Sequence, residues 1–155
     1  VTITSNAANN PTTIALTGTG SGSTNLAAGH PTSESSHTQG FTSSNVTDGS
    51  QDTYWESANN AFPQWVQVDL GSAQSASRIV LQLPASWGTR DETLSVLGST
   101  DGTNFTTVMP SATYSIGPSA TITFGATSQR YFRVNITANT GWPAGQVAEF
   151  QVWNQ

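Results

Sequence analysis

Two tryptophans lie in segments whose other residues are typical of loops. Trp87 belongs to the segment Pro84–Arg90 and Trp142 to the segment Asn139–Gly145, and both segments contain proline or glycine beside the aromatic residue. An aromatic ring is the surface on which the apolar face of a sugar packs, while nearby polar groups fix its hydroxyls. A loop tryptophan is about as often a lid over the hydrophobic core. Each residue is therefore a candidate sugar platform, with a structural role as the alternative.

Carboxylates could give the chain a second kind of chemistry, because glycosidases use two of them as acid and as nucleophile or base. Glu34 and Glu56 are the pair that the sequence offers. Such a pair needs a cleft, whereas a small strand-rich domain offers a shallow loop site. Neither His30 nor His37 has an evident serine and aspartate partner, and the string Gly-x-Ser-x-Gly does not occur. We therefore expect a binding function and no catalytic residues.

Composition narrows the class of partner further. Only 8% of the 155 residues are charged, the formal net charge is −5, and all four basic residues are arginine. An acidic chain without a basic cluster is a poor partner for nucleic acids or anionic membranes. The sequence has no cysteine, which excludes thiol catalysis, thiolate metal sites and disulfides. Abundant Ser, Thr, Asn, Gln and Gly favour a neutral, hydroxyl-rich ligand.

Alternating and β-branched runs predict an all-β fold, because helical periodicity is nearly absent. Seven short strands with turns between them are typical of an antiparallel β-sandwich or jelly roll. The Asp-Gly pair at Asp101 predicts a hairpin. The predicted strands are Trp65–Leu70, Ser77–Leu83, Thr93–Ser99, Phe105–Met109, Ala120–Phe124, Tyr131–Ile136 and Val147–Trp153.

The first 24 residues differ from the rest. Val1–Thr4 and Thr12–Thr17 read as two strands, and the Gly/Ser-rich stretch after them reads as a linker. The segment resembles the last hairpin of bacterial immunoglobulin-like repeats. We therefore predict that residues 1–24 are the tail of an upstream immunoglobulin-like domain plus a linker, that residues 25–155 form the main domain, and that the chain is cut from a longer protein.

Six short strings follow one another from Asn25 onward at ordinary spacing. They are Asn25–Pro31 (NLAAGHP), Asp48-Gly49 with Thr53–Trp55 (DG…TYW), Trp65–Gly71 (WVQVDLG), Ser99–Gly102 (STDG), Arg130–Val134 (RYFRV) and Glu149-Phe150 (EF). The set resembles the discoidin or coagulation factor 5/8 type C family, in its carbohydrate-binding branch, similar to family 32 carbohydrate-binding modules. That resemblance implies an antiparallel β-sandwich of the jelly-roll, galactose-binding-domain-like type, with Asn25–Pro31 as its first strand. It also implies that Trp55, Trp65 and Asp69 build the fold. Arg133 is expected to stack on a neighbour or to pair internally, with Asp69 as the candidate partner.

In the resembled family the ligand lies among loops at one end of the sandwich. The resemblance places Glu34, His37, Glu56, Arg90 and Trp142 there, and it favours Trp142 over Trp87 as the platform because the loop before the last strand borders the site. Glutamate and arginine suit the hydrogen bonding of neighbouring hydroxyls. The alternative for each charged residue is a solvated loop side chain.

The resemblance also implies a structural Ca²⁺ site, formed by the loop before Trp55 and the last strand. Hard cations take several oxygen ligands from carboxylates, hydroxyls and backbone carbonyls. The alternative is that Asp48 caps a turn and Glu149 pairs with an arginine. The candidate ligands are Asn45, Asp48, Ser50, Thr53, Ala148 and Glu149.

Together these features predict a non-catalytic carbohydrate-binding module of a secreted bacterial polysaccharide-degrading enzyme, monomeric and covalently linked to a catalytic domain. A glucan-type polysaccharide or oligosaccharide is the favoured ligand, and chitosan and terminal galactose are the alternatives. Polyanionic glycans are disfavoured by the lack of basic residues. An adhesion module that binds a protein or a phospholipid is the alternative from another class.

Overall fold

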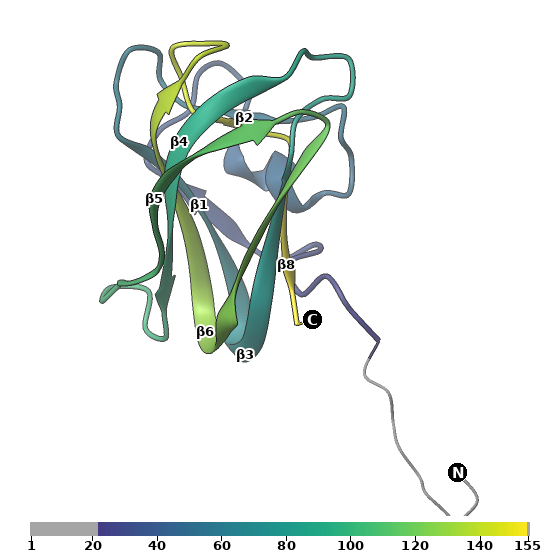
Figure 1. The fold of residues 1–155 in the computed structure, drawn as a ribbon, viewed down its shortest axis with the longest axis vertical. Coiled ribbons are helices and arrows are strands. Elements are labelled where there is room, and N and C mark those ends of the chain that lie inside the picture. Colours follow the sequence, from purple (N-terminus) through teal and green to yellow (C-terminus); the bar gives the residue numbers. More distant parts are fainter. Residues whose placement is uncertain (1–21, 155) are drawn as a thin grey trace, which may run out of the picture.

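Two long strands, β3 (Gln64–Gln82) and β6 (Ser119–Asn139), run antiparallel to each other and take part in both layers of a β-sandwich (Figure 1). The computed structural model describes residues 22–154. The first part of β3 pairs with β1 (Thr32–Glu34), and its last part pairs with β8 (Glu149–Trp153). The predicted antiparallel β-sandwich is therefore confirmed.

The remaining elements complete the two layers and the loops at one end. The main sheet has the order β1-β3-β6-β4-β5, with β8 paired to β3, and a separate two-stranded sheet is made by β2 and β7. The bounds are η1 Ser43–Thr47 (a 3-10 helix), β2 Trp55–Glu56, β4 Arg90–Ser99, β5 Thr106–Ile116 and β7 Gln146–Val147. No helix among the described residues is long and apolar enough to cross a bilayer.

The predicted strands Trp65–Leu70 and Ser77–Leu83 are parts of one strand. The pairing of β3 with β6 shifts register after Asp69 instead of ending there. Gly71 has a φ of 79°, and its backbone N–H donates to Asp69 Oδ1 at 2.8 Å, so the residues that suggested a turn form an irregularity inside the strand. The predicted strands Ala120–Phe124 and Tyr131–Ile136 likewise both belong to β6.

Two further strand predictions are wrong at the ends of the domain. The segment Asn25–Pro31 forms a turn, joined to Trp153 by a single β-bridge from Asn25, and does not form a strand. The predicted strand Val147–Trp153 is interrupted at Ala148, so that β7 pairs with β2 while β8 pairs with β3. The domain tail predicted for residues 1–24 lies outside the described residues up to position 21.

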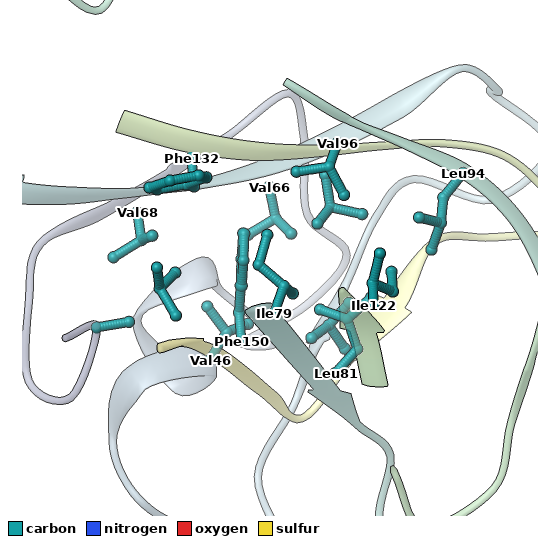
Figure 2. Packing of buried hydrophobic residues seen from close by; sticks show 14 of the residues in the cluster. Val46, Val66, Val68, Ile79, Leu81, Leu94, Val96, Ile122, Phe132 and Phe150 are labelled. Carbon is teal, nitrogen blue, oxygen red and sulfur yellow. The ribbon is translucent and has the colours of Figure 1, made fainter. Parts of the chain in front are cut away.

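The core fills the space between the layers with aliphatic and aromatic side chains from both halves of the long strands. Figure 2 shows Phe132 and Val96 on one side of the cluster and Ile79 and Leu81 on the other. Trp55 is fully buried, and its Nε1 donates to the Ser36 carbonyl at 2.9 Å. This core holds the short strand β2, and therefore the residue after Trp55, in a fixed place.

The charged pairs on the outer face of the sheet differ from the prediction. Arg130 makes a bidentate contact with Asp69, through Nε at 2.7 Å and Nη2 at 2.8 Å, and this contact holds the pKa of the Asp69 carboxyl below its usual value. Arg133 instead donates to Gln67 Oε1 and stacks between the rings of Trp65 and Phe105. Arg130 lies three residues before Arg133 in β6, next to Tyr131, the residue that pairs with Asp69 in the β3–β6 register.

Candidate carbohydrate-binding site

The end of the sandwich that carries β2 and β7 has a cleft of about 410 Å³. In Figure 1 this end is uppermost, near the β2 label, and the described end of β8 lies below it. Residues come to the cleft from β2 and the loop before it, the start of β4 and the loop before it, the β6–β7 loop, and β7. The side chains that form its walls are Tyr54, Glu56, Trp87, Arg90, Trp142 and Gln146.

The polar floor of the cleft is a chain of three hydrogen-bonded side chains. Glu56 and Gln146 face each other in the β2–β7 register, and Gln146 Nε2 donates to Glu56 Oε2 at 2.6 Å. Arg90 Nη1 donates to Gln146 Oε1 at 2.5 Å. Gln146 thus bridges the Glu56 carboxylate and the Arg90 guanidinium. Glu56 is 8% exposed and lines the cleft, and no described residue donates a hydrogen bond to its Oε1.

An aromatic wall stands beside this floor. Phe41 and Tyr54 are stacked with ring centroids 4.5 Å apart, and Tyr54 meets Trp87 edge-on at 4.6 Å. The Arg90 guanidinium lies 4.6 Å from the Trp87 ring centroid. Burial, followed by the negative charge of Glu56, raises the pKa of the Tyr54 hydroxyl. Trp87 is therefore covered on several sides and packs against the core.

Trp142 is the exposed aromatic residue of the cleft. Its exposed fraction is 47%, and it is the only large hydrophobic residue counted as exposed in the described range 22–154. Its indole Nε1 donates to Asn59 Oδ1 at 3.2 Å, and the Asn60 N–H donates to the Pro143 carbonyl at 2.7 Å. One hydrogen bond holds the edge of the indole, one backbone bond holds the residue after it, and ring surface stays open to solvent.

Three of the five predicted site residues, Glu56, Arg90 and Trp142, line this one cleft. The structure does not bring Glu34 and His37 into it. Glu34 Oε1 accepts a hydrogen bond from His37 Nδ1 at 2.7 Å, and its Oε2 accepts one from the Ser43 N–H at the start of η1. Both residues therefore order the β1–η1 connection. A ligand-binding role for any of the five stays a prediction.

Sequence reasoning did not name the residues that hold the predicted ones in place. Gln146 follows two small residues in the sequence and is 3% exposed, so nothing in its local pattern distinguishes it from a core-edge glutamine. Asn59 contacts Trp142 across 83 sequence positions. Such contacts arise from the pairing of distant loops, and only a paired-strand register could have indicated them.

Three of the predicted calcium ligands, Asp48, Thr53 and Glu149, have contacts at the turn that precedes Thr53. Thr53 Oγ1 donates to Asp48 Oδ2 at 2.7 Å, and Glu149 Oε1 accepts from the Gly49 N–H at 2.9 Å. Burial, with a further contribution from Asp48, raises the pKa of the Glu149 carboxyl to about 7. Two carboxyl groups that disfavour each other's charge, with neutral oxygens beside them, fit the donor set of a hard cation.

The other three predicted calcium ligands are Asn45, Ser50 and Ala148. Asn45 Nδ2 donates to the Tyr54 carbonyl at 2.8 Å, the Ser50 carbonyl accepts from Thr53 Oγ1 at 3.1 Å, and Ala148 is buried between β7 and β8. The described residues hold no group of three or more His, Cys, Asp or Glu side chains suited to a metal. A cation here would therefore depend on neutral oxygens for most of its ligands.

The close approach of Gly141 to Arg90 gives a prediction about the cleft. A Cβ at position 141 would lie 2.8 Å from Arg90 Nε, so Gly141→Ala should displace this flexible side chain from Trp87 and Gln146. We expect oligosaccharide affinity to fall about fivefold, or ~1 kcal/mol, with almost no change in thermal stability. The matched control is Gly88→Ala, which also borders the cleft but has open space around its Cβ position. Equal losses from both variants would refute this role of Arg90.

Fold and cleft together define the class of galactose-binding-like β-sandwich domains with a loop cleft at one end. A family model, described as a NedA-like, galactose-binding domain of the F5/F8 type C group, matches residues 45–134. The match covers more than half of the 155 residues, and the chain belongs to this family. No curated protein matches the chain.

Solved structures of relatives narrow the comparison. Chitosan-binding module 1, derived from a chitosanase/glucanase of Paenibacillus sp. IK-5, is 37% identical with a TM-score of 0.72, over 83% of this chain and 98% of that chain. Chitosan-binding module 2 from the same enzyme, solved with chitotriose, is 36% identical with a TM-score of 0.68 over the same shares. The family 32 module of C. perfringens NanJ, solved with galactose, is 22% identical with a TM-score of 0.75, over 84% of this chain and 98% of that chain, and shares the fold. These neighbours are carbohydrate-binding modules.

Proposed function

We propose that this chain is a non-catalytic carbohydrate-binding module that holds an oligosaccharide in the end cleft by stacking it on Trp142. The observation that carries the proposal is the exposed Trp142 indole, fixed at its edge by Asn59 and lining the same cleft as the carboxylate of Glu56. An exposed ring that is already oriented loses little conformational freedom on binding. Arg90 and Gln146 would fix hydroxyl groups at the opposite side of the cleft.

For the sugar itself, an amino sugar of the chitosan type is favoured over the neutral glucan that the sequence favoured. Arg90 donates to Gln146 through Nη1 and lies over the Trp87 ring, and the one carboxylate that lines the cleft is that of Glu56. A protonated glucosamine amine is the complementary group. The two relatives named as chitosan-binding modules are also the ones with more than a third of their residues identical to this chain.

Calorimetric titration with three trisaccharides and one monosaccharide tests both levels of the proposal. Chitotriose, its N-acetylated form, cellotriose and galactose would each be titrated at low and at high salt. We expect chitotriose to bind best and to bind more weakly as salt rises, because salt screens the amine–carboxylate attraction. Salt-independent binding of cellotriose at equal strength would replace the amino-sugar ligand by a neutral glucan. Absence of binding to every sugar would overturn the proposed function itself.

The context that fits this role is a secreted, multidomain, polysaccharide-degrading enzyme in which the module is a monomer tethered to a catalytic domain. Support comes from the relatives, whose source is a chitosanase/glucanase. A tethered module raises the local concentration of substrate, so that weak binding at a single shallow site is useful.

We also propose that a structural Ca²⁺ is held by the carboxylates of Asp48 and Glu149 with the Thr53 hydroxyl and carbonyls of Asn45, Ser50 and Ala148. The raised pKa of the Glu149 carboxyl, caused by burial and by Asp48, supports this, since a cation between the two groups would favour their charged forms. The ion would tie the loop before β2 to the start of β8, and so steady Trp55 and the cleft residue after it.

Calcium is therefore expected to raise the thermal unfolding temperature. At an ion concentration 100-fold above the dissociation constant the added stability is about 2.7 kcal/mol. Glu149→Gln should abolish the increase, whereas Asp52→Asn, an exposed acid of the same loop, should leave it intact. Differential scanning calorimetry with calcium, with magnesium and with a chelator measures the effect. Unchanged unfolding in all three conditions would exclude the ion.

A further inference from the structure

A single amide side chain closes the loop that carries Trp142. Asn139 Oδ1 accepts hydrogen bonds from the N–H groups of Gly141 at 2.8 Å and Trp142 at 3.3 Å, and Asn139 Nδ2 donates to the Ala144 carbonyl at 3.0 Å. The amide thus bonds both to the beginning and to the end of the loop. It can do so in only one orientation, because its oxygen must face the two N–H groups and its nitrogen the carbonyl.

Glu92, on the neighbouring strand, contacts the Asn139 amide and supports its orientation. It lies opposite Asn139 in the β4–β6 register, and its Oε1 accepts from Asn139 Nδ2 at 2.9 Å. Glu92 is 0% exposed and does not line the cleft. A fully buried glutamate is unusual unless it is paired, and its Oε2 has no hydrogen-bond partner in the structure. Glu92 is therefore a buried acid next to the loop of the cleft, and it cannot contact a ligand directly.

We propose that Glu92 is a positioning residue of the carbohydrate-binding cleft: it holds Asn139, and through Asn139 the loop that presents Trp142. The inference rests on the proposed binding function for its effect on affinity, but the contacts that hold the loop are independent of any sugar. If Glu92 is replaced by an apolar side chain, Asn139 Nδ2 loses an acceptor and the amide can turn. The loop would then exchange between conformations, and the Trp142 ring would be presented only part of the time.

The surroundings of Glu92 add a dependence on pH. Burial raises its pKa to about 8, opposed by the backbone of Gln146 and by Arg90 on the same strand. Asn139 on β6 and Gln146 on β7 are uncharged, and the next charged group, Glu56 on β2, is reached through Gln146. Because the folded chain keeps a proton that the unfolded chain releases above the ordinary value of 4.5, the free energy of unfolding falls as pH rises from there to about 8.

Amide hydrogen exchange followed by NMR tests the positioning role without any sugar. In Glu92→Leu the Gly141 and Trp142 amides should exchange about tenfold faster than in the wild type, the loss expected for one buried hydrogen bond of ~1.4 kcal/mol. Amides of the β3–β8 pair, such as that of Val80, serve as the reference for global stability. Glu92→Gln keeps an acceptor oxygen and a neutral side chain, and should retain wild-type exchange.

Affinity and pH give two further readouts. Chitotriose should bind about tenfold more weakly to Glu92→Leu and with wild-type strength to Glu92→Gln at pH 7. After correction for intrinsic rates, loop exchange in the wild type should rise as the pH increases toward 8, the range in which the free energy of unfolding falls, while Glu92→Gln should show no such rise, which tests the role even if Glu92→Leu does not fold. Wild-type loop protection in Glu92→Leu, or identical pH profiles for wild type and Glu92→Gln, would overturn the proposal. If no sugar binds, the proposed binding function fails, and the exchange results alone decide whether Glu92 positions the loop.

Discussion

Trp142→Ala is expected to weaken oligosaccharide binding about 100-fold while leaving the fold intact. Large aromatic residues at the centre of a binding site typically contribute 2 kcal/mol or more, and ~2.7 kcal/mol corresponds to that factor. The indole is 47% exposed and makes one side-chain hydrogen bond, to Asn59, so its removal leaves no cavity in the core. Calorimetric titration with chitotriose measures the affinity, and thermal unfolding measures the stability.

Two matched tryptophans make this result specific. Trp153→Ala removes a half-buried indole on β8, which lies over Arg78 away from the cleft, and should leave affinity unchanged. Trp87→Ala removes a ring that packs against the core and supports Tyr54, so it should lower both affinity and thermal stability. A Trp142→Ala variant with wild-type affinity would show that Trp142 is not the platform, and the ligand would then have to lie on Trp87.

The sequence predicted the fold well where the chain alternates and poorly where strands bend. The strings around Trp65–Gly71 and Arg130–Val134 lie on the central pair β3 and β6, whose regular register is set by buried alternation. Strand β3 continues through Gly71, which reads locally as a turn. Whether such a glycine ends a strand or makes a bulge depends on the partner strand, which the local sequence does not contain.

In the candidate site, too, residues with a local sequence signal are predicted, and residues whose role depends on distant partners are not. Glu56, Arg90 and Trp142 were predicted because each stands next to a recognisable string or in a Gly/Pro-rich loop, and all three line the cleft. Gln146 and Asn139 were missed because their importance lies in hydrogen bonds to partners far along the chain. The sequence also predicts Glu34 as a ligand contact, but its carboxylate accepts hydrogen bonds from the Ser43 N–H and from His37.

Glu56→Gln is expected to separate charge from shape at the cleft floor. The glutamine keeps an oxygen that can accept from Gln146 Nε2, so the floor should keep its geometry. Hydrogen bonds to charged groups are worth about 1.5–3 kcal/mol, so chitotriose affinity at low salt should fall about 10- to 100-fold. The salt dependence of the remaining binding should disappear, because the carboxylate that carries it is gone. Calorimetric titration at two salt concentrations measures both effects.

The neutral ligand supplies the decisive contrast, because N-acetylated chitotriose has the same backbone without the amine charge. If Glu56 acts by charge, the wild type and Glu56→Gln should bind N-acetylated chitotriose with nearly equal affinity. If Glu56 acts by hydrogen-bond geometry, Glu56→Gln should bind both chitotriose and N-acetylated chitotriose more weakly than the wild type does. Glu34→Gln is the matched control, since that carboxylate is also held by hydrogen bonds but lies outside the cleft lining. Glu34→Gln could instead lower chitotriose affinity as much as Glu56→Gln does. That result would mean that the ligand extends over β1. It would also mean that long-range attraction by the acidic surface, and not the Glu56 contact, selects the sugar.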